Sequence, residues 1–169
     1  MLEWSSRFAV VMLVGLGAAL MPSAETAAQN APAAPASPAP TPFNPGVGDL
    51  MNLIVQPHHT KLWFAGHEGN WVLAEYEIHE LRSALANVAK ARPLYRQKSV
   101  SNSIEMFVSG AFTSMEGVIH DRGAAKFADA YATINAGCNA CHTSLGQSQV
   151  VIRTPEQATY PDQEFRPQK

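Results

Sequence analysis

Apolar residues recur at intervals of three and four through most of the chain between residues 71 and 145. This spacing places them on one side of an α-helix and leaves the charged residues between them on the opposite side. The clearest series contains Trp71, Ala74, Ile78, Leu81, Leu85 and Val88. The pattern predicts helices that each bury one apolar face, so we expect an all-α chain.

The residues around this series predict where its helix begins and ends. Asn70 lies at the N-cap position, and Pro93 cannot continue a helix. A second series predicts another long helix, with Ile104, Val108, Ala111, Met115 and Val118 on its apolar face and with Phe107, Phe112 and Ile119 widening that face. A third series predicts a last helix over residues 124–145, with Phe127, Tyr131, Ile134, Cys138, Cys141 and Leu145 on its apolar face.

The first helical segment is less regular because Pro57 interrupts it. A proline inside a helical pattern either kinks the helix or begins a new segment. Four helical elements with short connections predict an antiparallel four-helix bundle over residues 48–145. Residues 146–169 contain three prolines, and we expect them to form an extended C-terminal strap across the bundle.

The N-terminal residues have the pattern of an export signal. An apolar run at residues 8–20 follows Arg7, and small residues precede possible cleavage points after Ala24 and Ala28. The run is too short for a typical membrane span, although an uncleaved anchor is an alternative interpretation. We expect a signal peptide over residues 1–28, a Pro/Ala-rich linker over 29–47, and a periplasmic mature chain without a membrane span.

Composition narrows the possible functions. The 169 residues suffice for one domain, and 12 Lys and Arg against 14 Asp and Glu give a net charge of −2. Because there is no basic excess, nucleic acid is not an expected partner. The chain has only two cysteines, which excludes a framework of several disulfides.

Both cysteines belong to one motif, Cys138-Asn139-Ala140-Cys141-His142, which has the C-x-x-C-H pattern of c-type haem attachment. On a helix, residues three apart face the same side, so both thiols can reach the two vinyl groups of one porphyrin. His142 follows directly and can bind the iron as the proximal ligand. The motif predicts one covalently bound haem c.

Other interpretations of the cysteine pair remain. An exported thiol oxidoreductase could use Cys138 and Cys141 without haem, although such pairs usually follow a strand in a βαβ unit. A zinc site would need a fourth ligand beside these cysteines and His142. A structural disulfide between residues three apart would close too small a loop to stabilise much.

The position of the motif on the last of four helices resembles the cytochrome c′ class. The resemblance covers roughly residues 48–145 and is carried by Cys138, Cys141 and His142. It implies a four-helix haem domain, possible binding of NO or CO, and a possible homodimer through the first two helices. The chain departs from that class in its C-terminal strap and in having no basic residue between His142 and Arg153.

A second resemblance rests on residues 59–66, HTKLWFAG, and on the Asn70-Trp71 pair. These residues are similar to a group of uncharacterised exported c-type cytochromes with the same layout.

A sixth iron ligand would have to precede the motif, because no Met or His follows His142. Candidates are Met51, His58, His59, Met106 and Met115. Counting helical positions straight through Pro57 places His58 on the apolar side with Met51, whereas restarting at Pro57 places His59 beside Leu62 and Trp63. We take His59 as the first candidate for the distal ligand; the alternative is a histidine satisfied by hydrogen bonds in the core.

These observations predict a periplasmic monohaem cytochrome that exchanges single electrons with redox partner proteins. A binder of NO or CO at an open distal site and the exported thiol oxidoreductase are the two alternatives. The sequence contains no recognisable nucleophile, no pair of acid and base residues, and no sign of a substrate pocket. We therefore do not expect an enzyme.

Overall fold

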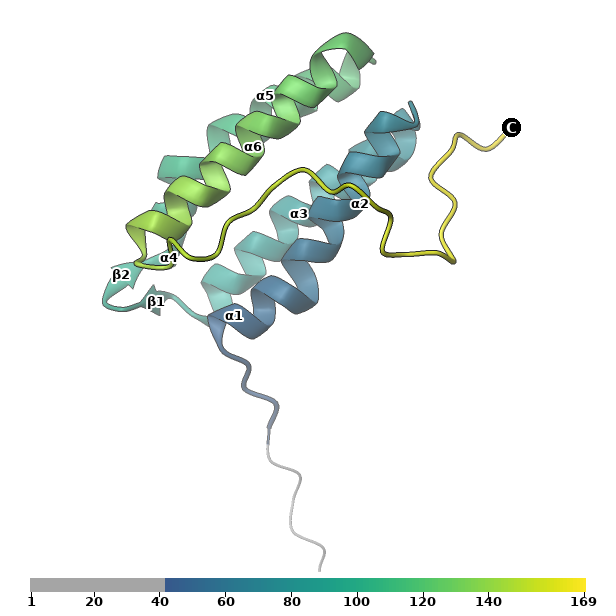
Figure 1. The fold of residues 1–169 in the computed structure, drawn as a ribbon. Helices are drawn as coiled ribbons and strands as arrows, with labels where there is room; N and C mark the ends of the chain where they lie inside the picture. The colour runs from purple at the N-terminus through teal and green to yellow at the C-terminus, as the bar shows by residue number, and fades with distance from the viewer. Residues whose placement is uncertain (1–41) are drawn as a thin grey trace, which may run out of the picture. The chain divides into compact units, whose positions relative to one another are not determined.

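Helices account for most of the described residues, 42–169, of the computed structural model (Figure 1). The expected signal peptide and most of the expected linker lie outside this range. The expectation of a mostly helical chain is confirmed. Between residues 42 and 169, no helix has the length and apolar content needed to cross a membrane.

The first helical segment is continuous and contains a π-helical stretch. Its parts are α1 (Val47–Leu50), η1 (Met51–Val55) and α2 (Gln56–His67). The π stretch ends at Val55, two residues before Pro57, which has no N–H to donate to the preceding turn. The Gln56 N–H bonds the Met51 carbonyl five residues back. A π turn contains one more residue than an α turn, so it changes which side of the helix each later residue faces.

This rotation decides between the two ways of counting through Pro57. His59 is buried together with Leu62 and Ala65, whereas His58 is only partly buried. The count restarted at the proline is therefore the correct one.

The helix predicted from the clearest series is α3 (Trp71–Ala91). The side-chain oxygen of Asn70 accepts a hydrogen bond from the Leu73 N–H at 3.2 Å, which confirms the predicted N-cap. Every member of the series after Trp71 is buried. The helix ends just before Pro93, as expected.

A second π stretch interrupts the next helical segment. Its parts are α4 (Val100–Ile104), η2 (Glu105–Ser109) and α5 (Gly110–His120). After η2 the buried face contains Phe112, Met115 and Ile119, all of which were expected on it. Ala111 and Val118 are only partly buried. The predicted face is thus confirmed, but Ala111 and Val118 lie at its edge instead of its centre, because the π turn adds a residue that a uniform helical count does not include.

A short hairpin between α3 and α4 was not predicted. Strands β1 (Leu94–Tyr95) and β2 (Lys98–Ser99) pair antiparallel, with Leu94 opposite Ser99. The turn residues Arg96 and Gln97 both have positive φ, at 48° and 66°, which non-glycine residues rarely adopt. The Arg96 guanidinium donates to the Gly146 carbonyl at 3.0 Å, so a distant contact holds the turn.

The last helix, α6 (Ala124–Ser144), carries the cysteine motif and ends shortly after it. Gly146 has a φ of +72°, and the Gln147 N–H bonds the His142 carbonyl at 2.8 Å while the Gly146 N–H bonds that of Thr143. This pairing is the Schellman motif that glycine favours at helix ends. The Lys98 ammonium also donates to the Ser144 carbonyl, so the hairpin caps the same end.

The helices pack in pairs: α2 on α3, α3 on α5, α5 on α6, and α2 on α6. At Gly137 of α6 the backbones approach so closely that an added Cβ would lie 2.4 Å from the Phe107 carbonyl oxygen of η2. Residues 146–169 contain no helix or strand and run from the end of α6 across to α2 (Figure 1). Near their end, buried Phe165 packs on Phe64 of α2, with ring centroids 5.6 Å apart.

Candidate functional site

The two cysteines lie one turn apart in the second half of α6. Cys141 is buried, Cys138 is half-buried, and both are free thiols. Tyr131 and Ile134, which precede them on the same helix, are fully buried. The thiols therefore point toward the apolar side of α6, as the spacing predicted.

The environment keeps both thiols protonated near neutral pH. Burial, with a contribution from the neighbouring Cys141, raises the pKa of Cys138 to about 12, and burial also raises the pKa of Cys141. Redox-active cysteines need the opposite shift, which a helix N-terminus or a nearby cation provides. This pair lies far from the N-terminus of α6, so the arrangement does not favour thiol–disulfide exchange.

His142 is partly buried, one turn after Cys138. Its Nδ1 lies 2.9 Å from the Val150 carbonyl oxygen. A carbonyl oxygen can only accept, so Nδ1 carries the proton and the Nε2 lone pair is available. Within residues 42–169, Nε2 has no hydrogen-bond partner. A histidine held in this way is suited to bind a metal through Nε2.

The tail after α6 supplies this carbonyl, and two asparagines of α6 hold the same stretch of tail. The Asn139 side chain donates to the Ile152 carbonyl at 2.8 Å and accepts from the Ile152 N–H at 2.7 Å. The Asn135 side chain donates to the Thr154 hydroxyl at 3.2 Å. We call these contacts and the bond between His142 and Val150 the α6–tail ladder.

Neither Asn135 nor Asn139 was predicted to be a functional residue. A signal was nevertheless present, because Asn135, Asn139 and His142 follow helical spacing on one side of α6. Their partners could not be read from the sequence, since three of the four ladder bonds involve backbone atoms of the tail.

His59 is buried and has partners at both ring nitrogens. Its Nε2 lies 2.7 Å from the Asn135 side-chain oxygen, and its Nδ1 lies 3.0 Å from the Tyr131 hydroxyl. Burial lowers the pKa of His59, which favours the neutral ring. To bind a metal through Nε2, His59 would have to release Asn135.

The other distal candidates lie in different environments. His58 Nδ1 lies 2.7 Å from the Glu77 carboxylate, and Met51 is partly buried. Met115 is fully buried in α5, whereas Met106 is 75% exposed on η2. Met106 therefore lies outside the core, and the ring of His58 is already bonded to Glu77.

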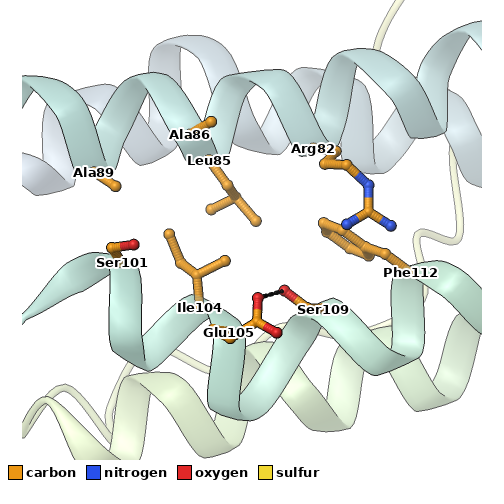
Figure 2. A pocket seen from close by; sticks show the side chains of 9 residues that line it. All are labelled: Arg82, Leu85, Ala86, Ala89, Ser101, Ile104, Glu105, Ser109 and Phe112. Carbon is orange, nitrogen blue, oxygen red and sulfur yellow. Dashed lines mark hydrogen bonds between the residues drawn. The ribbon is translucent and has the colours of Figure 1, made fainter.

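The hollow in Figure 2 lies away from the cysteine motif. It has a volume of about 180 Å³ and is lined by residues of α3 on one side and of α4, η2 and α5 on the other. Three of its polar residues have protein partners: Ser109 donates to Glu105 at 2.8 Å, and Arg82 pairs with Glu116 beside the hollow. These side chains bond one another rather than converging on the hollow.

Three metal-binding side chains of the His, Cys, Asp or Glu type do not gather at one point anywhere in the part of the chain that is described. The motif residues instead offer two thiols and one imidazole along a single helix. No protein family, curated protein or solved structure matches the chain. The class of site is therefore defined by these residues alone.

Proposed function

We propose that this protein is a periplasmic c-type cytochrome that carries one haem c bound to Cys138 and Cys141, with His142 as the proximal iron ligand. The observation that best supports the proposal is the hydrogen bond from His142 Nδ1 to the Val150 carbonyl. It leaves Nε2 free and fixes the ring, as is typical of metal-binding histidines.

The two cysteines suit thioether formation. In each link, the sulfur bonds the vinyl carbon next to the porphyrin ring and the thiol hydrogen goes to the terminal carbon, so no oxidant is consumed. Both thiols are free and on one side of α6. The bound haem would supply a one-electron ferric and ferrous couple.

The residues around the motif would set the reduction potential of that couple. The apolar interior around Cys141, Tyr131 and Ile134 would lower the dielectric constant near the iron. Electron exchange with redox partner proteins needs only an accessible haem edge. The half-buried position of Cys138 is consistent with such an edge.

We further propose that the helices form a four-helix bundle of the cytochrome c′ kind. The packing of α2 on α3, α3 on α5, α5 on α6 and α2 on α6 supports this arrangement, because these contacts connect all four segments in a ring. The C-terminal tail has no counterpart in the resemblance to that class.

The hydrogen bonds of His59 favour a second candidate function, the binding of NO or CO. With Nε2 on Asn135 and Nδ1 on Tyr131, His59 is already satisfied in the core. If it stays so when haem is bound, the distal position is left to a small gas. If His59 instead binds the iron, the protein is a six-coordinate electron carrier.

Absorption spectra of protein made with haem-attachment machinery test both candidates. We expect a Soret band that survives acid–acetone extraction in the wild type and is lost when Cys138 and Cys141 are both changed to Ala. Colourless protein would contradict the proposal and favour the thiol oxidoreductase.

The same spectra test the role of His59. An electron carrier with His59 as distal ligand has sharp α and β bands in the reduced form, and His59→Ala converts low-spin iron to high-spin iron. A broad high-spin spectrum that sharpens with CO, unchanged in His59→Ala, identifies the gas binder and removes His59 as a ligand.

A further inference from the structure

The α6–tail ladder has a regular geometry. Its positions on α6 are Asn135, Asn139 and His142, and its positions on the tail are Thr154, Ile152 and Val150. Steps of four and three residues on a helix advance roughly 6 and 4.5 Å, and two residues of extended chain advance roughly 6.6 Å. The two spacings are close enough for every second tail residue to meet one polar side chain of α6.

The tail is also held at both ends by groups other than His142. At its beginning, Gly146 ends α6 and its carbonyl accepts from Arg96. Toward its end, Phe165 packs against Phe64, and the Asn70 side chain donates to the Arg166 carbonyl at 3.2 Å.

Asn139 makes two hydrogen bonds to the middle of the tail. Its side-chain amide uses both its oxygen and its nitrogen on the backbone of one residue, Ile152, at 2.7 and 2.8 Å. Ile152 lies two residues from Val150, so this clamp fixes the Val150 carbonyl independently of the imidazole that it accepts from. The acceptor is thus in place before any ligand binds.

We infer that Asn139 is a positioning residue for the proximal ligand, acting through the backbone of Ile152 and Val150. This inference rests on the proposed haem function. A fixed acceptor on Nδ1 holds the ring orientation of His142 and makes Nε2 a better electron donor, which stabilises ferric iron. The variable second residue of the C-x-x-C-H motif then has a definite task in this chain.

The test compares haem-loaded wild type with Asn139→Ala. We expect covalent haem in both proteins, a higher reduction potential in the variant, and a lower iron–imidazole stretching frequency in ferrous protein after photolysis of its CO complex. Ile152→Pro, which removes the N–H that Asn139 accepts, is a second variant and should shift both values in the same direction. Asn102→Ala is the control, because Asn102 is exposed on α4 and away from the tail.

The outcomes separate this inference from the proposed function. If the wild type holds covalent haem while both variants keep its potential and stretching frequency, the inference is wrong and the haem proposal stands. If the wild type attaches no haem, the proposed function fails and the inference fails with it. A change in Asn102→Ala as large as in Asn139→Ala would also overturn the specific role of the clamp.

Discussion

Because Gly137 has no Cβ, the backbone of α6 can approach that of η2 closely at this position. An added Cβ would meet the Phe107 carbonyl oxygen at 2.4 Å, and backbone cannot move aside as a flexible side chain can. Gly117 is also helical, but a Cβ there meets nothing within 4 Å. The two glycines therefore form a matched pair.

We expect Gly137→Ala to lower the free energy of unfolding by about 1–3 kcal/mol through overpacking. Gly117→Ala should raise it by about 0.5–1 kcal/mol, because alanine has the higher helix propensity. Denaturant unfolding of both variants measures the difference. Equal stability of the two would contradict the close contact between α6 and η2.

The buried Glu77 gives a pH dependence of known sign. Its side chain is almost fully buried on α3 and contacts His58 at 2.7 Å, with Lys61 and Glu80 nearby. Burial raises the pKa of Glu77, an effect that His58 and Lys61 partly oppose. A carboxyl group with a raised pKa in the folded state favours folding most below its unfolded pKa, and that contribution is lost as pH rises through the folded pKa.

Glu77→Gln should therefore gain stability relative to the wild type as pH increases from 4 to 7, since glutamine can still accept from His58 without carrying a charge. Unfolding midpoints in urea across this range measure the gain. Glu75→Gln, on the exposed side of the same helix, is the control and should show no such trend. A wild type that becomes steadily more stable than Glu77→Gln toward neutral pH would contradict the sign.

At the scale of elements, the start of α3 depends on one side chain. Asn70 caps the Leu73 N–H and also donates to the tail at Arg166. Asn70→Ala should lower the free energy of unfolding by about 1 kcal/mol, whereas Asn70→Ser, which can still cap, should lose less than half of that. Thermal and denaturant unfolding test this order. Equal losses in the two variants would show that the tail contact, and not the cap, carries the effect.

The sequence predicted the helices because each has a strong apolar period. It did not predict η1 and η2, since a π turn adds a residue without a distinctive local composition. As a result, Ala111 and Val118 were expected at the centre of the buried face, whereas Phe112 and Ile119, expected at its edge, are the residues that are buried. Pro57 signalled an irregularity but could not show on which side of it the helical count changes.

The hairpin was missed for a different reason. Its turn residues, Arg96 and Gln97, are not the glycine or asparagine that usually mark such turns. Arg96 is held in its strained conformation by the Gly146 carbonyl, fifty residues away. A contact of that kind exists only once the chain has folded.

The part of the candidate site whose residues are close together in the sequence could be predicted. Cys138, Cys141 and His142 are adjacent in sequence, and helical spacing alone places them together. The Val150 carbonyl and the clamp of Asn139 on Ile152 depend on the path of the tail, which composition does not specify.

At the scale of the whole described region, residues 42–169, the tail adds a second connection between α6 and α2, which also pack directly on each other. Its first half is bonded to α6 beside His142, and its second half is packed on α2 through Phe165. Through Asn135, the same ladder also reaches His59 of α2. His142 and His59, the proposed proximal and distal ligands, are therefore linked to one segment of chain.

Intact mass measurement of protein exported by cells that possess haem-attachment machinery tests the central claim most directly. The account predicts the mass of the mature polypeptide plus one haem, with both sulfurs in thioether links, and no added haem in the variant lacking both cysteines. The polypeptide mass alone, with Cys138 and Cys141 as free thiols or joined in a disulfide, would contradict it.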